Sequence, residues 1–205
     1  DFPWTRPISR EALRKHVSRG VPEMTSGLFQ RTMETMAYFK DALAPYPKCR
    51  QAIHLTQPDL QGPFENAVHL WGSDIFYAVY DEPDYLRDLL DVLGQTWVLA
   101  VRKFAEVSTE AAQDDFVYLH FTIVKGRVVL KEDSTMLLSP QQYAEFIRPV
   151  NEVALGALGT GGIHWCGKAD RRRSQVVETR GLSCIDLGNP DMIDLPTWAV
   201  TLKER

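Results

Sequence analysis

The stretch Gly162-Ile163-His164-Trp165-Cys166-Gly167 combines apolar residues with a histidine and a cysteine. Its length and composition predict a short buried strand that ends at Cys166. Side chains alternate along a strand, so His164 and Cys166 project from one face while Trp165 faces the other. The stretch therefore places an imidazole and a thiol together at the end of a buried strand.

Predicted strands and helices alternate along the rest of the chain. Strands are expected over residues 49–56, 116–123, 128–130, 162–166 and 182–187, and helices over 28–43, 64–71 and 82–107. Ser9 is the expected N-cap of an N-terminal helix. Ser139-Pro140 opens another helix, and Pro149 marks its interruption or kink. This alternation favours an α/β fold in which helices cover a parallel sheet.

Length, composition and charge limit the classes of protein to which the chain can belong. We treat residues 1–205 as a single domain, with a mainly helical segment at 1–48. The net charge of −4 argues against nucleic acid as a partner, and no apolar run approaches the roughly 20 residues of a membrane helix. Three cysteines cannot all pair within the chain, which favours a reducing cytoplasm over a disulfide framework.

Several segments, in chain order, resemble the uroporphyrinogen decarboxylase superfamily. They are Gln61-Gly62-Pro63-Phe64, then Asp133 with Ser139-Pro140, Tyr143 and Pro149, then His164-Trp165-Cys166-Gly167, and finally residues 181–186 with Asn189-Pro190-Asp191. Together they span roughly residues 55 to 195. The resemblance implies an α/β fold of the (β/α)8 TIM-barrel type, with its active site at the C-terminal ends of the strands.

The barrel is expected to be incomplete. About four of the eight strands are identifiable, whereas a whole barrel of this type typically needs ~250 residues. The family's opening strands, with their substrate-binding arginines, have no match in this sequence. We therefore expect either a piece of a larger enzyme or a reduced variant, whose open sheet edges would be available for pairing.

His164 and Cys166 are the candidate metal ligands. Imidazole nitrogen and thiolate suit zinc, which usually takes three or four protein ligands. Their spacing resembles the His-x-Cys pattern of the superfamily's methyltransferase branch, in which a further cysteine lies far downstream. Cys184, on the next predicted strand, is either a substitute ligand or a small core residue. The alternative for His164 and Cys166 is that they end a strand and bind no metal.

Acidic residues at two other strand ends are the candidate catalytic groups. Only one of Glu132 and Asp133 can face the barrel mouth. The resemblance favours Asp133, as an orienting carboxylate or as an anchor for a substrate nitrogen or cation, whereas Glu132 is expected to be an ordinary solvated residue. Alternatively, Asp133 caps the following turn. Asp186 is expected to face the mouth as an acid or an orienting group.

His54 and Gln57 are the candidate cofactor-binding residues. They lie at the end of the first predicted strand, where His54 is expected behind the groups that touch a ligand. A hydrogen-bonded core histidine is the alternative for His54. His120 is interpreted in the same way.

The resemblance implies a zinc-dependent methyltransferase that moves a methyl group from a corrinoid-type donor to a thiol. The metal would keep the thiol as its thiolate near neutral pH. One alternative is decarboxylation of uroporphyrinogen or a related tetrapyrrole, which needs no metal. Another is a barrel remnant that binds a tetrapyrrole or a partner subunit without turnover. The expected partners are a small-molecule substrate and a corrinoid protein, and the sequence leaves homo-oligomerisation open.

Overall fold

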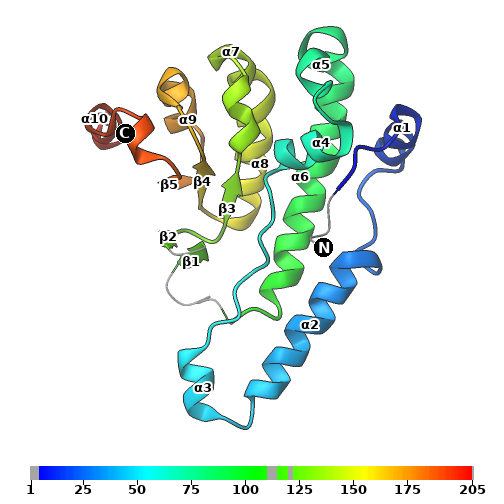
Figure 1. The fold of residues 1–205 in the computed structure, drawn as a ribbon, viewed down its shortest axis with the longest axis vertical. Helices are drawn as coiled ribbons and strands as arrows, with labels where there is room; N and C mark the ends of the chain where they lie inside the picture. The colour runs from blue at the N-terminus through cyan, green and yellow to red at the C-terminus, as the bar shows by residue number, and fades with distance from the viewer. Residues whose placement is uncertain (1–4, 110–114, 120–121, 205) are drawn as a thin grey trace.

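A three-stranded parallel sheet lies at the centre of the computed structural model, which describes residues 5–109, 115–119 and 122–204 (Figure 1). The strands are β3 (Val129–Lys131), β4 (Gly161–Trp165) and β5 (Leu182–Leu187), in that order across the sheet. Both pairings are parallel. The strands predicted at 128–130, 162–166 and 182–187 are confirmed to within one residue, as is the parallel arrangement.

Helices precede, separate and follow these strands. The longer ones are α1 (Arg10–Arg19), α2 (Gly27–Leu43), α4 (Pro63–Trp71), α6 (Pro83–Ala105), α8 (Arg148–Leu158) and α10 (Leu195–Lys203). The shorter ones are α3 (Pro47–Ala52), α5 (Ile75–Asp81), α7 (Pro140–Gln142) and α9 (Arg173–Val177), with 3-10 turns η1 (Asp133–Leu137), η3 (Asp170–Arg172) and η4 (Pro190–Met192). Figure 1 shows α2 and α3 extending away from the sheet.

The predicted helix starts are confirmed. The Ser9 side chain accepts a hydrogen bond from the Ala12 N–H, and Ser139 forms a capping box with Gln142. A π-helical turn (Tyr143–Ile147) separates α7 from α8. Pro149 lies in the first turn of α8 and has no N–H to donate to the carbonyl four residues earlier, which explains the expected interruption.

Two strand predictions are wrong. Residues 49–56 form no strand, because Pro47 begins the helix α3 and the chain after it is extended without a ladder. The chain that follows residue 56 reaches β3, where the Gly62 N–H donates to the Lys131 carbonyl at 2.8 Å. The single strand expected over 116–123 is an antiparallel pair, β1 (Phe116–Leu119) and β2 (Thr122–Lys125). Helix α5 was not predicted.

The two faces of the sheet have different neighbours. Leu130, Ile163 and Trp165 are almost fully buried, in one core cluster with residues of α4, α6 and α8. On the other face, Val129 and Cys184 pack against Val117 and Val124 of the β1–β2 pair. The observed architecture is thus a parallel α/β sheet with helices over one face. Closure into a barrel stays a prediction.

The helices also bear on the question of membranes. Within the ranges that the structure describes, none combines the length and the apolar character needed to cross a bilayer.

Trp165 packs on the helix side of the sheet, as the alternation along β4 predicts. It is 1% exposed, and its ring lies 5.4 Å from that of Trp198 in α10, centroid to centroid. We expect Trp165→Ala to lower the free energy of unfolding by about 3–5 kcal/mol, since a large buried aromatic leaves a cavity. Chemical denaturation measures the loss, with Trp165→Phe as a milder control. A loss below about 1 kcal/mol would contradict this packing.

Glu132 is not in solvent, contrary to expectation. It is 1% exposed and accepts a hydrogen bond from the Tyr143 hydroxyl at 3.3 Å. Alternation explains this, because Asp133 takes the open side and Glu132 turns into the core. Burial raises the pKa of Glu132 to about 8, against the opposing effects of Asn151 and the Arg172 charge.

This shift predicts a pH-dependent stability. The pKa of Glu132 is higher in the folded than in the unfolded protein. Its contribution to the free energy of unfolding is therefore fully present below about pH 4.5 and is lost as the pH rises to about 8. Glu132→Gln keeps the shape of the neutral acid and should flatten the decline. Urea unfolding of both proteins from about pH 5 to about pH 8 measures it. Equal pH slopes for both proteins would show that Glu132 is ionised in the fold.

Candidate metal centre

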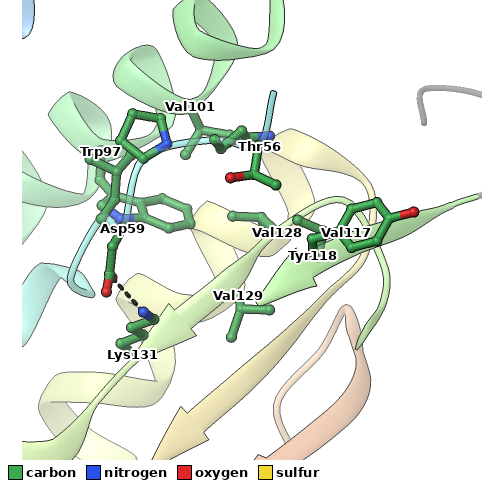
Figure 2. Close-up of a pocket in the computed structure, with 12 residues that line it drawn as sticks. Thr56, Asp59, Trp97, Val101, Val117, Tyr118, Val128, Val129 and Lys131 are labelled. Atoms are coloured by element: carbon green, nitrogen blue, oxygen red, sulfur yellow. Dashed lines mark ion pairs between the residues drawn. The ribbon is translucent and has the colours of Figure 1, made fainter. Parts of the chain in front are cut away.

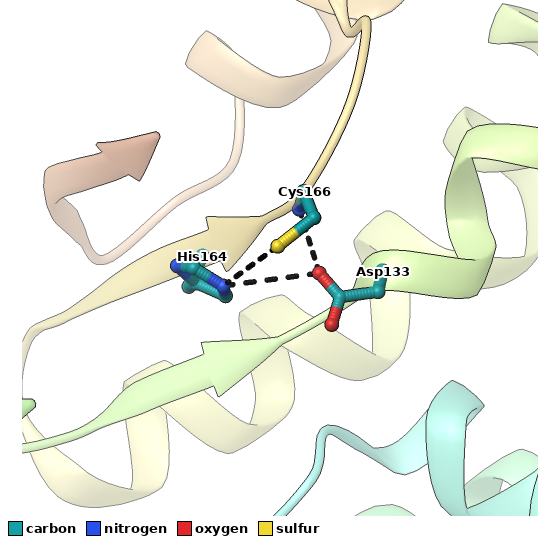
Figure 3. A group of neighbouring side chains, drawn as sticks. All are labelled: Asp133, His164 and Cys166. Atoms are coloured by element: carbon teal, nitrogen blue, oxygen red, sulfur yellow. Dashed lines mark hydrogen bonds and ion pairs between the residues drawn. The ribbon is translucent and has the colours of Figure 1, made fainter. Parts of the chain in front are cut away.

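Asp133, His164 and Cys166 converge at the C-terminal ends of β3 and β4 (Figure 3). His164 Nε2 lies 3.7 Å from Cys166 Sγ and 3.8 Å from Asp133 Oδ1. One donor atom from each of the three residues lies within 4.8 Å of the other two. Asp133, His164 and Cys166 thus lie on one side of the strand ends, as expected from the alternation along each strand. Their roles stay predictions.

A carboxylate holds the second nitrogen of His164. Nδ1 lies 2.7 Å from Asp186 Oδ2, and Asp186 is the register partner of His164 on β5. A proton on Nδ1 satisfies the carboxylate and leaves the Nε2 lone pair directed at Cys166 and Asp133. A carboxylate behind the imidazole is the usual arrangement of metal-bound histidines in proteins. Asp186 is therefore placed to orient His164 and does not belong to the group of Asp133, His164 and Cys166.

Backbone contacts fix the position of Cys166. Its N–H donates to Asp133 Oδ1 at 2.6 Å, and the next N–H, of Gly167, donates to Asn189 Oδ1 at 2.8 Å. Gly188 lies against the sulfur, because a Cβ there would come within 2.7 Å of Cys166 Sγ. Any larger residue at Gly188 would displace the thiol or the loop. The sequence offered no signal for this close approach.

The donor set fits a zinc ion. Two donors on one tetrahedral zinc lie about 3.5 Å apart, given Zn–N and Zn–S bonds of about 2.0 and 2.3 Å. The observed 3.7 Å between Nε2 and Sγ is near that separation. A nitrogen, a sulfur and a carboxylate oxygen suit zinc, whereas magnesium and calcium prefer oxygen alone. His164, Cys166 and Asp133 would thus hold the metal, with Asp186 behind the imidazole.

Cys184 behaves as a core residue. It is the register partner of Gly162 and lies two residues before Asp186 on β5. It packs with Val129 beneath the β1–β2 pair. Burial, with a contribution from the Asp186 charge, raises the pKa of the Cys184 thiol to about 11. Cys184 does not belong to the group formed by the three converging side chains. This packing supports the interpretation of Cys184 as a small core residue rather than as a substitute metal ligand.

The residues predicted from the first strand lie elsewhere. His54 is exposed, in a segment that is not a strand, and its ring stacks on Tyr118 at 5.0 Å. Gln57 lines a cavity of about 230 Å³ between the 56–60 segment, α6 and the strands β1 and β3 (Figure 2). Neither belongs to the group around His164. His120 lies outside the described residues.

Lys131 is a residue of this region that the sequence analysis missed. Its side chain is 5% exposed, and Nζ pairs with Asp59 Oδ1 at 2.5 Å at the edge of the cavity (Figure 2). Lys131 is the register partner of His164, so both side chains share a face of the sheet. Its position two residues before Asp133 was the available signal.

The same side chains resemble a nucleophilic Cys–His–Asp triad, but their surroundings oppose that role. Partial burial and the negative charge of Asp133 raise the pKa of the Cys166 thiol. A catalytic cysteine needs the opposite shift. The N–H groups of Cys166 and Gly167 already donate to side-chain oxygens and are not free to bind an oxyanion. The arrangement suits a bound cation better than acyl transfer.

The raised pKa of the Cys166 thiol can be tested in the metal-free protein. Cys166 should react slowly with iodoacetamide near neutral pH, and its rate should climb as the pH passes the usual range of a thiol. Asp133→Asn keeps the acceptor for the Cys166 N–H but removes the charge, so it should speed the reaction severalfold. Peptide mass spectrometry follows the labelling, with the exposed Cys49 as internal reference. A slower reaction in Asp133→Asn is the contrary outcome.

Comparison with known proteins adds a likeness of fold. No protein-family model and no curated protein sequence matches the chain. Among solved structures, a methyltransferase from Methanosarcina mazei aligns with 89% of this chain, at a TM-score of 0.59 and 14% sequence identity. The alignment covers 47% of that protein, so the present chain spans about half its length. The chain therefore has a methyltransferase-like α/β fold.

Proposed function

We propose that this chain carries the metal centre of a (β/α)-barrel methyltransferase of the uroporphyrinogen decarboxylase superfamily, in which zinc holds a thiol acceptor. The observation that carries the proposal is the His164–Cys166 pair, with Nε2 and Sγ 3.7 Å apart and Nδ1 held by Asp186 at 2.7 Å. The likeness of fold to a methyltransferase supports it. Decarboxylation would use neither the thiol nor the orientation of the imidazole.

Each side chain has a distinct task in this proposal. His164 and Cys166 supply nitrogen and sulfur, and Asp133 supplies a carboxylate oxygen while it orients Cys166 through the backbone N–H. Asp186 accepts a hydrogen bond from the Nδ1–H of His164 and so leaves Nε2 available. Zinc bound here would keep a thiol acceptor as its thiolate near neutral pH, the form that attacks a methyl group.

The methyl donor and the rest of the barrel belong to the same proposal. We infer a corrinoid-type donor from the resemblance of the His-x-Cys segment. Among the described residues, the face of the sheet that carries Lys131, His164 and Asp186 packs against the β1–β2 pair, whereas helices cover the opposite face. In a closed barrel this face would line the interior, and the donor would approach from the C-terminal ends of the strands.

Zinc content tests the proposal. Purified without chelator, the chain should carry about one equivalent of zinc, and Cys166→Ser or His164→Ala should remove most of it. Cys184→Ser is the matched control, since Cys184 is packed in the core and should leave the zinc content unchanged. Elemental analysis of the four proteins gives the answer.

Two results would contradict the proposal. One is a wild-type chain that binds no zinc even when zinc is added. The other is a Cys166→Ser variant that keeps it while Cys184→Ser loses it. A metal-free protein that consumes a tetrapyrrole carboxylate would favour the decarboxylase instead.

A further inference from the structure

A buried carboxylate holds the turn that carries Asp133. Glu65, in the first turn of α4, is 5% exposed. One of its oxygens accepts the Ser134 backbone N–H, and the other accepts the Ser134 hydroxyl at 2.6 Å. Both oxygens are therefore engaged by the residue that follows Asp133. Glu65 directly follows Gly62-Pro63-Phe64, whose sequence pattern has no part in the proposed metal chemistry.

Stability alone is a poor explanation for this carboxylate. Burial raises the pKa of Glu65, against the two Ser134 hydrogen bonds, and the negative charge of Asp133 raises it further. Removing a carboxylate from water costs free energy, and an apolar side chain would avoid that cost. What the carboxylate adds is a two-point contact that sets the position and direction of the turn.

The same turn is held from its other side. Arg172 of η3 donates to the Thr135 carbonyl and contacts Met136 Sδ at 2.7 Å. Glu65 and Arg172 thus restrain consecutive residues of η1 from two different helical elements. Asp133 is the first residue of η1, with its side chain 45% exposed and directed at His164 and Cys166. A shift of the turn would move Asp133 away from both.

We propose that Glu65 is a positioning residue of the metal centre, which acts through Ser134 to hold Asp133 against Cys166 and His164. The inference rests on the proposed function for its consequence, metal affinity. Its geometric part stands without metal, because the Asp133–Cys166 contact is a hydrogen bond within the protein itself. Residues behind metal ligands typically change affinity by about 10- to 100-fold when they are removed.

The test compares three variants with a matched control. Glu65→Ala removes both contacts to Ser134. Glu65→Gln restores them, since the amide oxygen accepts the N–H and the amide nitrogen donates to the hydroxyl. Glu152→Ala is the control, because Glu152 of α8 likewise accepts a loop N–H, that of Arg180 at 3.1 Å, but away from the centre. Ser134→Ala removes the hydroxyl contact alone.

The first readout uses the metal-free protein. The Cys166 amide proton should be shifted downfield by its short bond to Asp133 and slow to exchange. In Glu65→Ala we expect this resonance to move upfield and to exchange severalfold faster, with recovery in Glu65→Gln and no change in Glu152→Ala. An unchanged Cys166 amide in Glu65→Ala overturns the inference, whatever the metal affinity is.

The second readout is zinc affinity by competition with a chelator. Glu65→Ala should bind about 10- to 100-fold more weakly, while Glu65→Gln and Glu152→Ala stay near wild type. If wild type binds no zinc, the proposed function fails and the amide readout alone judges Glu65. If Glu65→Ala does not fold, Ser134→Ala takes its place, with a smaller shift in the same direction expected. No shift in Ser134→Ala would then overturn the inference.

Discussion

Parallel pairing determines which side chains of β3, β4 and β5 share a face of the sheet, and both the core and the candidate metal centre depend on it. Lys131 pairs with His164, and His164 pairs with Asp186, so the three form one row. Ile163 and Trp165 alternate with His164 and lie among the helices. A slip of β4 by one residue would turn the imidazole toward the helices and the indole toward the face that carries Lys131 and Asp186. Core packing therefore also specifies the orientation of the site.

Acidic side chains surround the candidate centre in two layers. Asp133 and Asp186 face His164 and Cys166 and accept hydrogen bonds from them. Behind the same turn, Glu65 and Glu132 are buried. The inner layer favours a cation between the donors and disfavours a free thiolate. Of the outer pair, Glu65 contacts the turn through Ser134, and Glu132 contacts Tyr143 in the core.

The elements that sequence analysis predicted well are those with local determinants. Ser9 and Ser139 cap helices through contacts within a single turn, and alternation along β4 places His164, Cys166 and Trp165 correctly. The helix α3 was missed because Ile53 and Leu55, which suit a strand, come directly after it, while Pro47 favours a helix start. The burial of Glu132 depends on Tyr143 of the π-helical turn, Asn151 of α8 and Arg172 of η3, which come later in the chain.

By itself, the sequence determined the α/β order of elements and the face that His164 and Cys166 share, because period-two alternation and the order of elements are local properties. Asp133 was a candidate through the family resemblance, and Asp186 through its place two residues after Cys184. Only the tertiary structure decided which candidates meet. It brought Asp133 and Asp186 to His164, left His54 and Gln57 elsewhere, and gave Glu65 its contact with the turn. Such contacts join residues from separate elements, and their distances follow from how helices and strands pack.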